Sequence, residues 1–138
     1  MKFTLPICPT PQKRARHASR GKFSTVYKCE KQKSNEEFIM FYLRDYVPEA
    51  TIEGPVSLVV KCYMPITKST SKKRAKMMLD GEIKHTKTPD CDNLLKNIMD
   101  CMTKMQFWKD DCQVFKISCS KEYSNSPRWE IELKEVEL

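Results

Sequence analysis

Two pairs of aspartates in the second half of the sequence have the residue types and spacing of a divalent-metal site. Asp90 and Asp92 follow Pro89, which favours an extended backbone just before a helical pattern begins. Residues two apart on an extended stretch point the same way, so both carboxylates can face one ion. Asp110 and Asp111 precede a strand-like run, and Asp111 can complete the site if that strand pairs near the start of the helix. Oxygen ligands without a convergent His or Cys favour Mg²⁺ or Mn²⁺ over zinc.

The helix that follows Asp92 separates an apolar face from a polar stripe. Lys96 and Asp100 continue the stripe at intervals of four residues from Asp92, opposite the face that includes Leu94 and Ile98. Simpler roles exist for each acidic residue: a helix N-cap, a helical ion-pair ladder with Lys96, and an acidic turn at 110–111. Each simpler role is commoner than catalysis when taken alone, but the combination favours a metal site.

Basic segments flank these carboxylates in the sequence. The net charge is +7, and residues 1–28 contain no acidic residue. We expect a basic arm at about 9–22 and a mobile basic loop at about 65–88 to hold a polyanion near the cation. The side chains expected to contact DNA are Lys13, Arg14, Arg16, Arg20, Lys72, Lys73 and Arg74. The alternative is that both segments are merely solvated loops.

The seven cysteines form no CxxC pair, and the two histidines, His17 and His85, lie far apart. Close ligand pairs are usual in tetrahedral zinc sites, so we expect buried free thiols, with a zinc site or a disulfide as alternatives.

The apolar stretch at the N-terminus is too short for a signal peptide, and no apolar stretch is long enough to span a bilayer. We therefore expect a cytoplasmic protein with no membrane contact, and the 3 glycines argue against a glycine-rich phosphate loop.

Hydrophobic periodicity predicts a single α/β or α+β domain. Helices are predicted at 34–46, where Ser34 and Glu37 fit a capping box, and at 92–105, with a short helix at 75–79. Strands are predicted at 2–8 (an edge strand, because of Pro6), 55–64, 112–119 and 128–136, with a short extended piece at 23–27 and a loop at 12–22. Phe107 and Trp108 are expected in the core or an interface, with stacking on an unpaired base as the alternative.

The pattern P-D-x-D-N-L-x-K-x-x-x-D, followed by W-x-D-D-x-Q-V, resembles the RusA family of Holliday junction resolvases. It runs from Pro89 through Lys96 to Asp100, and then from Trp108 to Val114. The resemblance extends more loosely to the first strand, the loop 9–16 and the last two strands. The departures are Cys91, Cys112 and the long Lys-rich loop 67–79.

This resemblance implies a homodimeric endonuclease of DNA recombination and repair, built on a small mixed β-sheet packed by about two helices. It implies Mg²⁺ as cofactor, no organic cofactor, and a four-way DNA junction as substrate. By position, Asp90, Asp92 and Asp111 would hold the metal and Lys96 would be the essential lysine. Asp100 and Asp110 would support them. A C₂ dimer would supply the two cuts that a two-fold symmetric junction needs.

Two alternatives remain at this stage. A metal nuclease of the restriction-enzyme type usually places a lysine two residues after its second acid, where this chain has Gln113. A non-catalytic basic DNA-binding module would explain the charge of +7 but not the grouping of the carboxylates.

Overall fold

The computed structural model describes residues 1–12, 16–20, 23–27 and 30–137, with side chains described for 1–12 and 34–137. Its centre is a four-stranded sheet of β1 (Lys2–Leu5), β4 (Val56–Met64), β5 (Val114–Tyr123) and β6 (Arg128–Glu135), in the order β1-β6-β4-β5. The central strand β4 pairs in parallel with β5 and antiparallel with β6, so the sheet is mixed. The predicted edge position of the first strand is confirmed, because β1 pairs only with β6 among the described residues.

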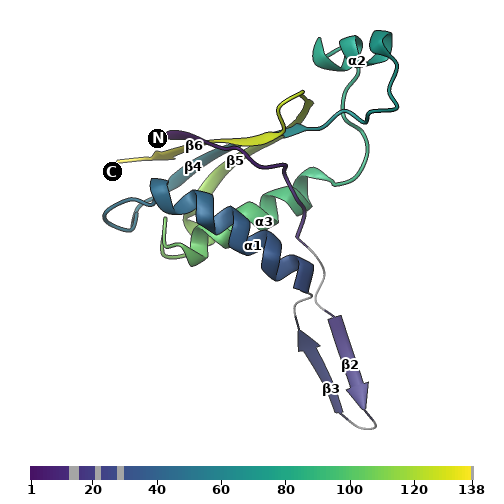
Figure 1. The fold of residues 1–138 in the computed structure, drawn as a ribbon. Helices are drawn as coiled ribbons and strands as arrows, with labels where there is room; N and C mark the ends of the chain where they lie inside the picture. The colour runs from purple at the N-terminus through teal and green to yellow at the C-terminus, as the bar shows by residue number, and fades with distance from the viewer. Residues whose placement is uncertain (13–15, 21–22, 28–29, 138) are drawn as a thin grey trace.

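Helices α1 (Glu30–Leu43) and α3 (Cys91–Lys104) cover one face of the sheet (Figure 1). Alternate residues of β4 point into this layer and are buried, as are Leu94, Ile98 and Met102 on the apolar face of α3. The Lys104 ammonium donates to the Glu36 carboxylate over 2.9 Å and ties α3 to α1. The predicted small α+β domain, with a mixed sheet packed by two helices, is confirmed.

Two predictions near the N-terminus were wrong. Residues 12–22 were expected to be a loop, but β2 (Arg16–Arg20) and β3 (Phe23–Tyr27) pair as an antiparallel hairpin that extends away from the sheet (Figure 1). The strand signal was missing because β2, RHASR, has no large apolar residue. Helix α1 begins at Glu30, so Ser34 lies inside it and not at its N-cap. The residues EKQK before Ser34 are all good helix formers, which extend the helix past the local cap signal.

Helix α2 (Lys72–Leu79) and the short helices η1 (Arg44–Tyr46) and η2 (Asp111–Gln113) complete the helical elements described here. The α2 helix begins earlier than the predicted 75, because Ser71 caps it by accepting from the Arg74 N–H over 3.3 Å. It ends at Leu79, and Gly81, just beyond the C-cap Asp80, has a φ of 81° that suits the left-handed position of a Schellman motif. Met78, 7% exposed, is the one residue of α2 that is buried. Within the described part of the chain, no helix has the length and apolarity needed to cross a membrane.

A second Schellman motif ends α3 and directs the chain toward the acidic turn. The Phe107 N–H donates to Met102 O over 3.1 Å and the Gln106 N–H donates to Thr103 O over 3.0 Å. Gln106 therefore takes the left-handed conformation, with φ of 63°. Phe107 and Trp108, both 0% exposed, then enter the core, and the Ile52 N–H donates to Phe107 O over 2.9 Å.

We expect Gln106→Gly to stabilise the protein by about 0.5–1 kcal/mol, because glycine adopts a left-handed conformation without the steric cost that glutamine bears. The higher entropy of glycine in the unfolded chain offsets part of the gain. The measurement is the free energy of unfolding in urea, with the exposed Gln106→Ala variant as the control that keeps a Cβ. Equal stabilities of the Gly and Ala variants would contradict the assignment.

Candidate active site

Asp90 and Asp92 lie together at the N-terminus of α3, and both are exposed. Asp90 occupies the N-cap position with extended backbone (φ −79°, ψ 157°), yet its side chain makes no capping hydrogen bond. Its carboxylate instead accepts from Asn93 Nδ2 over 2.9 Å. The simpler role of a helix cap therefore does not occupy either carboxylate, and both remain available to a ligand.

The two carboxyl groups are in hydrogen-bonding contact, and this contact is the largest of the influences that lower the pKa of Asp90. The backbone N–H of Asp90, the Asn93 amide and the charge of Lys121 lower that pKa further. Two carboxylates so close to each other repel, and a divalent cation bound between them would relieve that repulsion. The pair therefore has the electrostatics of a cation site, at a helix terminus that also favours negative charge.

Lys121 on β5 positions the segment that leads into Asp90. Its ammonium donates to the backbone carbonyls of Lys87 and Pro89, over 2.8 and 2.9 Å. The residue lies opposite Cys62 of β4, on the face of the sheet that packs against the helices. Sequence analysis missed this role. The available signal was a lysine at an inward position of an alternating strand, where an apolar side chain is usual.

If these carboxylates form the nuclease site that the sequence predicts, Lys121→Met should lower the rate of DNA cleavage by about 10–100-fold, because a displacement of about 1 Å in a catalytic group has effects of this size. Methionine keeps the apolar stem but cannot donate to the two carbonyls. The matched control is Lys116→Met, which removes an exposed lysine from the same strand. Partial rescue of the Lys121 variant by raised Mg²⁺ would indicate misplaced ligands. Equal cleavage rates for the two variants would rule out the positioning role.

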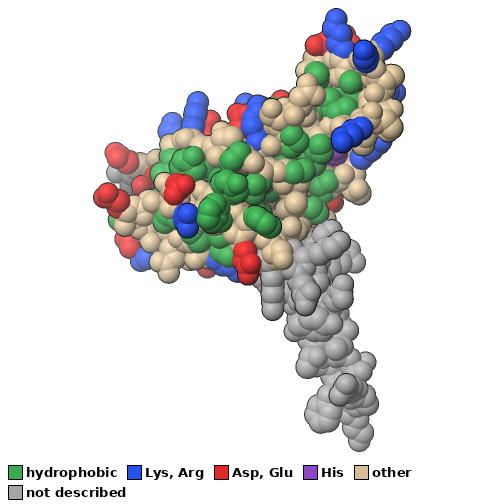
Figure 2. All heavy atoms as spheres, viewed as in Figure 1, with side chains coloured by type: hydrophobic (Ala, Val, Ile, Leu, Met, Phe, Trp, Pro, Cys, Tyr) green, Lys and Arg blue, Asp and Glu red, His purple; other side chains and the backbone are tan. Residues whose placement is uncertain are grey.

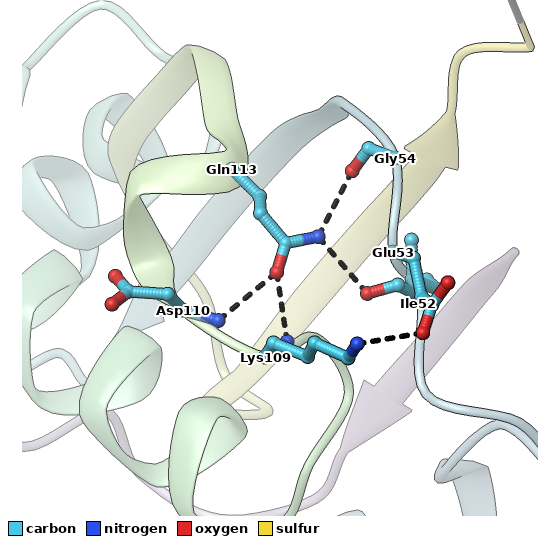
Figure 3. A network of polar contacts seen from close by, with 6 residues as sticks. All are labelled: Ile52, Glu53, Gly54, Lys109, Asp110 and Gln113. Carbon is cyan, nitrogen blue, oxygen red and sulfur yellow. Dashed lines mark hydrogen bonds and ion pairs between the residues drawn. The ribbon is translucent and has the colours of Figure 1, made fainter.

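The second acidic cluster sits on the short helix η2 (Asp111–Gln113), which Asp110 caps by accepting from the Cys112 N–H over 2.9 Å. The Gln113 amide holds this turn from both sides (Figure 3). Its oxygen accepts from the N–H groups of Lys109 and Asp110, over 2.8 and 3.0 Å. Its nitrogen donates to the carbonyls of Ile52 and Gly54, over 2.9 and 3.0 Å. The turn is thus fixed to a loop that lies far away in sequence.

Among the described residues, the group with at least three potential ligand atoms within 4.8 Å of one another is Asp110, Asp111 and Cys112. Contact with Asp110 and burial raise the pKa of Asp111, and the charges of Asp110 and Asp100 raise it further. The short helix η2 contacts α3, the helix that bears the polar stripe. The ligand atoms of Asp90, Asp92 and Asp111 do not share a 4.8 Å cluster in this structure, so their assembly around one ion stays a prediction.

The polar stripe of α3 also contacts the N-terminal segment. Gln12 donates its side-chain amide to the Asp100 carboxylate, and its N–H donates to Asn93 O over 3.3 Å. Asn97, 0% exposed, donates to Thr10 O over 2.9 Å. Asp100 thus has a partner other than Lys96 and anchors the start of the predicted basic arm on α3, which is consistent with a supporting role.

The residues expected to contact DNA differ in how far the structure describes them. Lys72, Lys73 and Arg74 are exposed on α2, where Lys and Arg side chains gather (Figure 2). Lys13 and Arg14 lie outside the described residues, as do the side chains of Arg16 and Arg20 on β2. Lys96 is exposed one turn after Asp92 on α3.

The core position expected for Phe107 and Trp108 is confirmed, and Trp108 Nε1 donates to Thr103 Oγ1 over 2.8 Å. Full burial removes both rings from any stacking on bases.

The expectation of buried thiols was partly wrong: the described cysteines are free, but Cys8 and Cys112 are exposed and only Cys62 and Cys101 are fully buried. The local sequence indicates that a cysteine lies in or beside a strand-like run, but it does not show whether the cysteine side chain points into the core.

The described chain is thus a small α+β domain that exposes one acidic pair at the start of α3 and a second acidic cluster at η2. The family model described as Endodeoxyribonuclease RusA matches residues 6–134, and the chain belongs to this family of endodeoxyribonucleases. The uncharacterized protein YqaN of Bacillus subtilis (strain 168) is 35% identical over 138 residues, which cover 99% of this chain and 96% of that protein. The crossover junction endodeoxyribonuclease rusA of Lactococcus phage r1t is 43% identical over 51 residues, which cover 37% of this chain and 39% of that protein.

Proposed function

We propose that the protein is a Mg²⁺-dependent, structure-specific endodeoxyribonuclease that resolves four-way DNA junctions by paired symmetric cuts. The observation that carries the proposal is the contact between two exposed carboxyl groups, Asp90 and Asp92, at a helix N-terminus where neither serves as a cap. Membership of the RusA family and the similarity to a phage crossover junction endodeoxyribonuclease support the same substrate class.

The donor set fits a hard divalent cation. Asp90 and Asp92 offer carboxylate oxygens side by side, and Asp111 would add a third from the turn beside α3. Oxygen donors of this kind suit Mg²⁺, with Mn²⁺ as a substitute. When bound, the cation supplies Lewis-acid stabilisation of the phosphate and lowers the pKa of a bound water.

The remaining residues have roles that follow from their charge and position. The Lys96 ammonium, one turn from Asp92, would stabilise the negative charge that develops on the phosphate or the leaving 3′-oxygen. Asp100 and Asp110 would position the ligands through their contacts with Gln12 and Cys112. The basic residues of the arm and of α2 would bind backbone phosphates, so binding would not depend on sequence and would weaken steeply with salt.

Paired cutting requires two active sites on one junction. We propose a homodimer with C₂ symmetry, because a four-way junction is itself two-fold symmetric and a dimer places one site on each of two opposing strands. Cleavage of this kind serves DNA recombination and repair.

The test uses a synthetic four-way junction and a linear duplex of the same sequence, each with Mg²⁺ or with EDTA. We expect symmetric nicks in the junction alone, and only with the metal. Binding to the junction without cleavage in any divalent metal would overturn the proposal and favour a DNA-binding module. Equal cutting of the linear duplex would indicate a nuclease without junction specificity.

A further inference from the structure

A pair of cysteines lies directly beneath the candidate active site. Cys91 stands between Asp90 and Asp92 as the first residue of α3, and it faces Cys119 on β5. The Cys119 Sγ lies 3.7 Å from Cys91 O, and the Cys91 Sγ lies 3.9 Å from Cys119 O. Each thiol therefore contacts the backbone of the other residue. Both are free and only partly buried, so a small reagent has access to them.

A third thiol makes Cys119 the reactive member of the pair. Cys62 on β4, which is fully buried, is in hydrogen-bonding contact with Cys119. This contact lowers the pKa of Cys119 to about 7, against the opposing effect of burial and with help from Cys91 and from the charge of Lys121. A thiolate is the species that attacks a disulfide, and this one is substantially present at neutral pH. Cys91 lies against Cys119, each sulfur in contact with the backbone of the other residue, so it is placed to be the second thiol to react.

The arrangement favours a two-residue link over a metal site. The three thiols are not among the described groups whose ligand atoms all lie within 4.8 Å of one another. Cys62 is 0% exposed and cannot meet a reagent, whereas Cys91 and Cys119 both reach the surface. The exposed Cys112 contacts the Asp110 carboxylate instead of another thiol.

We propose that Cys91 and Cys119 are a modification site. A low-molecular-weight disulfide such as oxidised glutathione oxidises them to a reversible Cys91–Cys119 disulfide, the link, which prevents the neighbouring carboxylates from binding the cation. The Cys119 thiolate attacks one sulfur of the reagent and one thiolate leaves. Cys91 then loses its proton to solvent, its sulfur attacks Cys119 Sγ, and the second thiolate leaves. The protein loses two hydrogen atoms, and the reagent is reduced to two thiols.

The consequence for the site follows from the geometry of the bond. An S–S bond of about 2.05 Å requires both sulfurs to leave the carbonyls that they now contact and to approach each other. Cys91 must move for this to happen, and Asp90 and Asp92 are its immediate neighbours in the chain. The link would therefore displace the carboxylates from the geometry that binds the cation; this part of the inference rests on the proposed nuclease function.

The first experiment measures the link itself. The full-length protein is treated with oxidised glutathione, and its intact mass and peptide map are recorded. We expect a loss of two hydrogen atoms and a linked pair of peptides that contain Cys91 and Cys119. Cys91→Ser and Cys119→Ala should abolish the link, whereas the matched variant Cys112→Ser should retain it, and thermal melting shows that each variant is folded. Mixed disulfides on Cys8 or Cys112 without this link, or a link from Cys119 to another cysteine, would overturn the proposal.

The second experiment measures the switch on a four-way junction. We expect the linked protein to cut at least about 10-fold more slowly than the reduced protein, and dithiothreitol to restore the rate. Cys119→Ala should cut at the normal rate with or without glutathione disulfide. If the linked protein cuts at full rate, the proposed loss of cleavage on oxidation is refuted, although the disulfide itself forms. If the reduced protein does not cut, the nuclease proposal fails, and the mass measurement still decides whether the site is modified.

Discussion

Asp90→Asn is expected to lower junction cleavage by about 10²–10³-fold or more while junction binding persists. Asparagine keeps an oxygen that can accept from Asn93 Nδ2, so the local hydrogen bond and the start of α3 should survive. The lost feature is the negative charge beside Asp92, and with it the attraction for a divalent cation. Removal of a negative charge near the phosphates should, if anything, strengthen binding to DNA. The measurements are single-turnover cleavage with Mg²⁺ and junction binding in EDTA.

A matched control separates the effect of losing a negative charge at the site from the effect of losing a negative charge elsewhere on the surface. Asp45→Asn removes an exposed aspartate from η1, and its cleavage rate should equal that of the unaltered protein. Normal cleavage by Asp90→Asn would refute the assignment of the Asp90–Asp92 pair. The cluster of Asp110, Asp111 and Cys112 would then become the candidate cation site, because its ligand atoms lie within 4.8 Å of one another.

The helix that bears these residues illustrates how much local sequence can determine. The apolar repeat of Leu94, Ile98 and Met102 predicted both the extent of α3 and its buried face, which leaves Asp92 and Lys96 on the exposed side. Amphipathic periodicity is strong where a long helix packs on a sheet. In the hairpin β2–β3, the extended piece predicted at 23–27 is confirmed as β3, whereas β2 was missed because RHASR has no large apolar residue.

The positioning of the carboxylates depends on contacts that no local pattern contains. Lys121 reaches carbonyls at 87 and 89, and Gln113 reaches carbonyls at 52 and 54. Each contact joins segments that lie far apart in the sequence, so residue type and spacing cannot reveal it. Gln113 belongs to the motif that resembles the RusA family, and the structure gives this position a physical role: it fixes the acidic turn to the body of the domain.

The role of Gln113 leads to an expected effect on both stability and cleavage. Gln113→Ala removes two acceptor contacts and two donor contacts at once, and water can replace only part of them because the side chain is half-buried. We expect the free energy of unfolding to fall by about 1–3 kcal/mol. We also expect cleavage by the folded protein to fall by about 10-fold or more, because Asp111 loses its fixed position.

Two further variants divide this effect into its parts. Gln113→Glu keeps an acceptor for the Lys109 and Asp110 N–H groups but sets a carboxylate oxygen against the carbonyls of Ile52 and Gly54, so a loss of stability at least as large as that of Gln113→Ala is expected. Lys109→Met breaks only the exposed ion pair with Glu53, whose 2.7 Å contact joins the same two segments (Figure 3). Its melting temperature should hardly change, because exposed ion pairs contribute little. If Lys109→Met were as damaging as Gln113→Ala, the ion pair and not the Gln113 amide would hold the turn in place.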